Sequence, residues 1–107
     1  MKELLFDTEN CAIARVSKVL QGKWTMVILY ILSEGTLRFS EIKRKLPNVT
    51  DANLTKDLRL LENYGVIHRK VYPVVPPKVE YSLTDMGIDF LPILDSLNRW
   101  AEKYTTD

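Results

Sequence analysis

The sequence contains little cysteine, histidine and glycine, and each shortage excludes a class of protein. One cysteine and one histidine occur among 107 residues. The single cysteine, Cys11, excludes a disulfide within the chain and suits a reducing compartment. One cysteine and one histidine on separate segments cannot build a structural zinc site. With no glycine-rich phosphate loop and no carboxylate pair in an evident pocket, the sequence predicts neither an enzyme nor a bound metal or cofactor.

Long apolar runs are absent as well. No run approaches the roughly 20 residues that a membrane-spanning helix needs. The first ten residues, MKELLFDTEN, are acidic where a signal peptide has a basic start and an apolar stretch. We therefore expect a cytoplasmic protein without a membrane partner. The length fits a single domain over residues 1–107.

The charge is nearly balanced overall but unevenly distributed. Residues 38–78 contain nine basic and four acidic residues, a net +5, whereas the rest of the chain has six basic and ten acidic residues, a net −4. A basic middle between acidic flanks favours a polyanionic partner. A solvated surface of mixed charge is the alternative.

Hydrophobic spacing predicts two helices in the first third of the chain. The first spans about residues 10–21 and ends before Gly22. The second ends before Gly35, which occupies the usual position of a C-terminal stop. Its predicted buried stripe consists of Trp24, Val27, Ile28, Ile31 and Leu32.

A helix-turn-helix pattern follows a short extended segment at residues 36–39. Ser40 is the expected N-cap of the first helix of the pair, which stops at Pro47. Thr50 is the expected N-cap of the second helix, which ends near Gly65. Two helices joined by a three-residue turn, at about residues 40–64, form this motif.

After Gly65 the apolar period becomes two, which is typical of strands. Two such runs, about residues 66–72 and 78–83, flank a proline-rich loop and predict a basic β-hairpin. Thr84 is the expected cap of a final helix over about residues 84–104. A helix-turn-helix followed directly by a basic hairpin predicts a winged helix. The expected fold class is α+β, mainly α, with a small three-stranded sheet and terminal dimerisation helices.

The basic and polar residues of this module predict binding to double-stranded DNA. The second helix of the pair can enter the major groove, where Asn53 can pair with adenine and Lys56 can reach guanine or a phosphate. Cations of the preceding helix and of the hairpin suit phosphate contacts. Arg59 can alternatively pair with Asp57 or Glu62. The candidate DNA-binding residues are Arg38, Ser40, Lys43, Arg44, Lys45, Thr50, Asn53, Thr55, Lys56, Arg59, Arg69, Lys70 and Lys78.

The final helix carries more apolar surface than one small domain needs for packing. Its spacing is similar to that of a coiled-coil seam and predicts a homodimer, with helix packing onto its own domain as the alternative. A two-fold dimer would place two recognition helices on a palindromic operator. The candidate interface residues are Phe90, Leu94, Leu97, Trp100 and Tyr104.

Four strings of the sequence match a known family. They are GKWTMVILYIL (22–32), RFSEIKRKLP (38–47), LTKDLRLLENYGVIHRKVYP (54–73) and VPPKVEYSLTDMG (75–87). With Cys11 ahead of them, the chain resembles the HxlR-type branch of the MarR-like winged-helix regulators over residues 11 to about 100. The resemblance implies a dimeric transcription factor with its dimer formed by the terminal helices. It also implies a recognition helix at residues 50–64 and a wing around residues 66–83.

Two features of this resemblance bear on specificity and on signalling. Asp51, Ala52 and Asn53 stand where many relatives carry Gln, Arg or Lys, so an operator sequence cannot be carried over. In some relatives a cysteine at the position of Cys11 senses oxidants or electrophiles, and a helix N-terminus favours the reactive thiolate. A packed, inert thiol is the alternative. A winged helix used for protein–protein contact and a regulator that senses a small molecule are the alternative functions.

Overall fold

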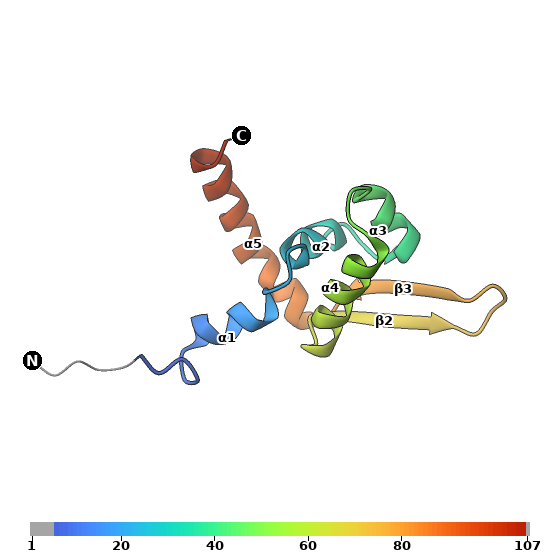
Figure 1. Ribbon diagram of the computed structural model, residues 1–107, viewed down its shortest axis with the longest axis horizontal. Helices are drawn as coiled ribbons and strands as arrows, with labels where there is room; N and C mark the ends of the chain where they lie inside the picture. The colour runs from blue at the N-terminus through green and yellow to red at the C-terminus, as the bar shows by residue number, and fades with distance from the viewer. Residues whose placement is uncertain (1–5, 107) are drawn as a thin grey trace, which may run out of the picture.

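The computed structural model describes residues 6–106, and within them it contains five helices and one three-stranded antiparallel sheet (Figure 1). The expectation of a cytoplasmic protein depends partly on residues 1–10, and residues 1–5 of these lie outside the described range. None of the described helices is both long and apolar enough to cross a membrane. The elements are α1 (Ala12–Val19), α2 (Thr25–Leu32), β1 (Leu37–Arg38), α3 (Phe39–Lys45), α4 (Asp51–Asn63), β2 (Ile67–Tyr72), β3 (Lys78–Leu83) and α5 (Asp85–Tyr104).

The core lies where α2, α3 and α4 meet the sheet and the first half of α5. Leu54, Leu58 and Leu61 are the buried leucines of α4, as their spacing predicts. Each fully buried side chain of this size contributes roughly 1.5–3 kcal/mol to folding. The other buried apolar residues are Ile28, Leu29, Leu32, Ile42, Val49, Val66, Ile67, Tyr81 and Leu94.

The strands are ordered β1-β3-β2, so the last strand in sequence lies in the centre of the sheet. β2 and β3 form the predicted hairpin, which projects beyond the helices (Figure 1). Directly paired residues share a face of a sheet. Arg38, Glu80 and Lys70 therefore form one row across the three strands. The neighbouring row, Leu37, Tyr81 and Arg69, lies on the opposite face.

Two of the three predicted N-caps are confirmed, and one is wrong. The Thr50 Oγ1 accepts a hydrogen bond from the Asn53 amide at 3.1 Å, and the Thr84 Oγ1 accepts one from the Gly87 amide at 3.4 Å. The expected cap Ser40 instead lies inside α3, whose N-cap is Arg38. Glu41 explains this earlier start, because its carboxylate accepts the Arg38 amide at 2.8 Å and stabilises the first turn.

The predicted buried stripe of α2 is wrong in part. The structure buries Thr25, Ile28, Leu29 and Leu32, whereas Val27 is 38% exposed. The helix has the sequence TMVILYIL, so apolar side chains lie on nearly every side of it. Hydrophobic periodicity could not identify which side faces the core, and tertiary packing decided it.

The molecule is more extended than a compact domain of its length. Its Cα radius of gyration is 16.3 Å, whereas a compact chain of this length has about 13 Å. The wing, α1 and the C-terminal half of α5 project in different directions from the core (Figure 1). α1 buries none of its residues, and Ile13 is 75% exposed. The projecting helices thus leave apolar surface uncovered.

Candidate nucleic-acid interface

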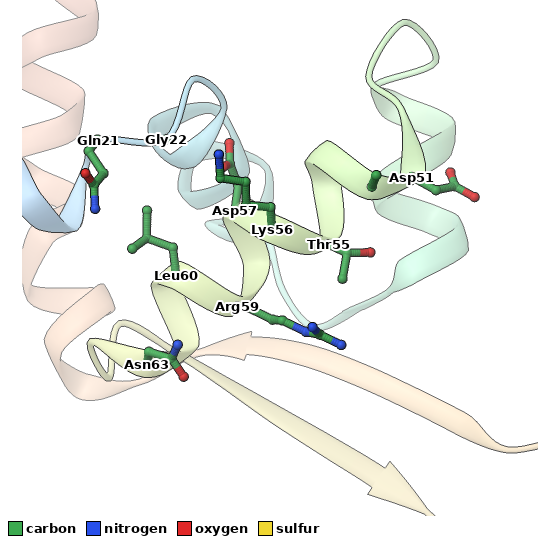
Figure 2. Close-up of a pocket in the computed structure, with 10 residues that line it drawn as sticks. Gln21, Gly22, Asp51, Thr55, Lys56, Asp57, Arg59, Leu60 and Asn63 are labelled. Carbon is green, nitrogen blue, oxygen red and sulfur yellow. The ribbon is translucent and has the colours of Figure 1, made fainter.

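The side of α4 that faces away from the core is polar and accessible. Asp51, Ala52, Asn53, Lys56 and Arg59 are all exposed. An open hollow of about 690 Å³ lies along this helix and reaches the α1–α2 connection (Figure 2). The N-terminal half of α4 is therefore presented to a partner by a helix whose opposite side is fixed in the core.

Lys56 and Arg59 diverge from one another on α4. In Figure 2 the Lys56 side chain extends toward the α1–α2 connection at Gly22, whereas Arg59 extends away from it. Among residues 6–106, no ion pair joins Arg59 to Asp57 or Glu62. The alternative that Arg59 is neutralised by a neighbour on its own helix is therefore not realised.

Asp57 has a structural role that the sequence analysis missed. It is 4% exposed, and its Oδ2 accepts the Trp24 amide at 2.8 Å, across 33 positions of the chain. Gly22 leaves the space for this contact, because a Cβ there would lie 2.4 Å from the Asp57 Oδ1. The hydrogen bond fastens the middle of α4 to the start of α2. Gly22, two positions before Trp24, is the sequence signal of this close approach.

The three consecutive cations of α3 have different surroundings. The Lys43 ammonium donates to the carbonyl oxygens of Pro47, at 3.4 Å, and Val49, and it lies 3.8 Å from the Asp51 carboxylate. It therefore stabilises the turn between α3 and α4. Arg44 and Lys45 are exposed. Ser40 and Thr50 are exposed at the starts of the two helices, and Thr55 is half-buried beside the hollow.

The sheet brings together cations that are distant in sequence. Arg38 and Lys70 lie opposite Glu80 on the neighbouring strands. The Lys78 ammonium lies 3.5 Å from the Glu80 carboxylate, which also accepts the Tyr72 hydroxyl at 2.7 Å. The hydrogen bond from Tyr72 lowers the pKa of Glu80, with further lowering by Lys78 and Arg38. Glu80 thus remains ionised at neutral pH. Arg69 lies on the opposite face of β2, so the hairpin presents cations on both sides.

The candidate dimer residues divide between the core and the surface of α5. Leu94 belongs to the core of this chain, and Phe90 packs against it. Trp100 and Tyr104 are 57% and 63% exposed, and their ring centroids lie 5.6 Å apart. Leu97 lies beside them, and a shallow apolar groove of about 360 Å³ separates this surface from α2. The exposed part of the predicted seam is therefore its C-terminal half.

Cys11 occupies the N-cap position of α1 as a half-buried free thiol. Its carbonyl oxygen accepts the Arg15 amide at 3.0 Å, which begins the helix. Within the part of the chain that the structure describes, no three Cys, His, Asp or Glu side chains gather in a way that could hold a metal ion.

Comparison with known proteins places this geometry in a family. The model of the HxlR-like helix-turn-helix family matches residues 19–107. An HTH-type transcriptional regulator of Methanothermobacter thermautotrophicus is 47% identical over 98 residues, which are 92% of this chain and 75% of the relative.

Solved structures give the same result. The redox regulator HypR in its oxidised form has a TM-score of 0.82 at 40% identity, over 91% of this chain and 100% of HypR. A MarR-family protein from Porphyromonas gingivalis W83 has a TM-score of 0.85 at 34% identity, over 95% of this chain and 99% of its own. These matches confirm the winged helix-turn-helix fold and exclude an enzyme family. The chain belongs to the HxlR-like helix-turn-helix family of transcriptional regulators.

Proposed function

We propose that the chain regulates transcription by binding double-stranded DNA sequence-specifically as a homodimer. The observation that supports this most directly is that the N-terminal half of α4 exposes a polar side, while the opposite side of the same helix is buried in the core. A recognition helix of this kind reads base edges with its N-terminal residues. Asn53, exposed in the first turn of α4, suits adenine, and Ala52 suits the methyl group of thymine.

The cations around α4 supply the phosphate contacts. Lys56 extends toward one flank of the helix in Figure 2, which favours a phosphate over a guanine as its target. Arg44 and Lys45 are exposed on α3, and Arg59 is free of Asp57 and Glu62. Arg38, Arg69, Lys70 and Lys78 extend the basic surface along the sheet. Such contacts position the protein on the duplex without reading its sequence.

The homodimer is supported by the apolar surface of the projecting helices. Trp100 and Tyr104 are large, exposed and adjacent, and aromatic residues of this kind are common anchors of interfaces. α1 has no buried residue of its own and can cover such a surface in a second copy. A dimer also doubles the contact with DNA, since one winged helix reads only a short half-site.

Duplex binding as a function of salt tests this proposal. We expect the protein to bind a fluorescent duplex from its own promoter region more tightly than a shuffled duplex. Binding should weaken steeply with salt, with a slope of about −0.9 for each phosphate contacted. If no promoter duplex is bound even at low salt, the protein–protein alternative replaces this proposal.

A redox response through Cys11 is a second proposed property. It is supported by the half-buried free thiol at the start of α1 and by the similarity to HypR, described as a redox regulator in oxidised and reduced forms. Two Cys11 thiols of a dimer can lose two electrons and two protons to an oxidant and form an intersubunit disulfide.

Cys11→Ser isolates that response. We expect unchanged DNA binding by the variant in reductant and a loss of the parent's response to diamide, with a disulfide-linked dimer seen only in the parent. An unchanged response in the variant would remove Cys11 as the sensor.

A further inference from the structure

Four side chains near the outer end of the wing form a compact cluster on one face of the sheet. Lys70 and Tyr72 lie on β2, directly opposite Glu80 and Lys78 on β3. Two cross-strand pairs on the same face bring all four into contact distance. The row continues onto β1, where Arg38 lies opposite Glu80. We call these four residues and Arg38 the wing cluster.

The aromatic ring of Tyr72 organises the two lysines. The Lys70 ammonium lies 4.8 Å from the ring centroid, and the Lys78 ammonium lies 4.7 Å from it. Both distances are within the range of cation–π attraction. The two ammonium groups cannot be farther apart than the sum of these distances. Two long, flexible side chains are thereby held near one point of the wing.

Glu80 fixes the ring and one of the lysines. The Tyr72 hydroxyl donates to Oε1 of Glu80 at 2.7 Å, and the Lys78 ammonium lies 3.5 Å from Oε2. The hydrogen bond from Tyr72, followed by Lys78 and Arg38, lowers the pKa of Glu80, so its carboxylate stays charged in neutral solution. One negative charge thus stands among three positive charges, and the cluster keeps a net charge of +2.

We propose that Tyr72 and Glu80 are positioning residues, which hold Lys70 and Lys78 beside Arg38 as one preformed phosphate-binding unit of the wing. This inference rests on the proposed binding of duplex DNA. It adds one uncharged residue, Tyr72, and one acidic residue, Glu80, to the residues that support DNA binding. Lysine side chains lose rotamer freedom when they bind, and this loss of conformational entropy opposes binding. The wing cluster has already restricted that freedom in the unbound protein. Loss of the restraint therefore weakens binding although no cation is removed.

Tyr72→Phe and Tyr72→Leu test this without changing the charge of the protein. Phenylalanine keeps the ring and removes the hydrogen bond to Glu80, whereas leucine removes the ring as well. Tyr30→Phe, at an exposed tyrosine of α2, is the matched control. Binding to the selected duplex and to a shuffled duplex is measured over a range of salt, together with the melting temperature.

We expect Tyr72→Leu to weaken binding to both duplexes alike, roughly fivefold. The salt slope should fall by about 1, because one phosphate contact is lost. Tyr72→Phe should show a smaller loss in the same direction, and Tyr30→Phe none. In NMR spectra of the unbound protein, the ε-methylene protons of Lys70 and Lys78 should show ring-current shifts that disappear in Tyr72→Leu.

Three results would overturn the inference. They are an unchanged affinity and slope in Tyr72→Leu, a loss of affinity that only follows a lowered melting temperature, and the absence of ring-current shifts in the parent. Failure of the parent protein to bind any duplex is a different outcome, because it refutes the proposed function itself. The parent and the variants therefore test the two proposals separately.

Discussion

Lys43 shows how the surroundings of a single side chain change its expected role. The sequence predicts a phosphate contact for it, as for Arg44 and Lys45. In the structure its ammonium donates into the turn between α3 and α4, while Lys45 stays exposed. Two lysines on one helix are thus expected to behave differently, since one stabilises the motif and the other is available to DNA.

Lys43→Ala should lower the stability of the protein, and Lys45→Ala should not. The alanine removes the charged donor to the carbonyl oxygens of Pro47 and Val49, at a cost of about 1–2 kcal/mol. Urea denaturation followed by circular dichroism measures the difference. DNA binding should show the opposite order, because Lys45→Ala should flatten the salt slope by about 1, more than Lys43→Ala does. Equal stability of both variants would contradict the assignment of Lys43 to the turn.

The contact between Asp57 and Trp24 marks the limit of what the sequence shows at this scale. No local pattern indicates that an aspartate in the polar part of α4 is buried, because its partner lies 33 positions away. An aspartate on a helix is ordinarily solvated or paired with a neighbouring cation. Only the fold brings the Trp24 amide to Asp57. The same limit hid the wing cluster, whose members come from three strands.

Single elements were more predictable where their signals are local. Thr50 and Thr84 cap helices as expected, since an N-cap requires only a hydroxyl and an amide three positions later. The hairpin followed from its alternation and its prolines. Ser40 failed as a cap because Glu41, one residue on, closes the first turn onto Arg38. Local rules thus predict a helix start correctly unless two nearby residues compete for the N-cap position, as Arg38 and Ser40 do here.

Thr50 caps the N-terminal end of α4, which is the end proposed to read DNA. Thr50→Ala should therefore affect both stability and binding. It removes the acceptor of the Asn53 amide and should cost about 1 kcal/mol. Fraying of the first turn would also disorder Asn53, so DNA binding should fall more than stability predicts. Amide hydrogen exchange at residues 51–53 measures the fraying directly. Thr50→Ser keeps the acceptor and should behave like the parent, and a defect of equal size in both variants would refute the role of the cap.

At the scale of the whole molecule, the extended shape leaves the C-terminal half of α5 as a projecting apolar surface. Trp100→Glu places a charge within it and should dissociate the proposed dimer, because an unpaired charge in a desolvated interface is costly. Sedimentation equilibrium measures the dissociation. Arg99→Glu changes the preceding residue, which is paired with Asp95 rather than with the aromatic surface, and should leave the dimer intact. A monomeric parent protein would contradict the proposed assembly.

The proposed two-fold dimer also fixes how its half-sites are spaced on DNA. Recognition helices of such dimers lie one helical turn apart, about 34–36 Å, and enter successive major grooves on the same side of the duplex. Inserting about 5 base pairs, half a helical turn, between the half-sites of a selected palindromic operator rotates one of them to the opposite side. We expect this insertion to reduce affinity to that of an isolated half-site.

A comparison with Trp100→Glu separates the contribution of the second copy. The affinities of Trp100→Glu and of the parent should differ less on an isolated half-site than on the full palindrome, because only the palindrome engages both copies. Equal affinity of the parent for the palindrome and for the 5-base-pair insertion would mean that the two copies bind independently, and this would contradict the proposed two-fold arrangement on DNA.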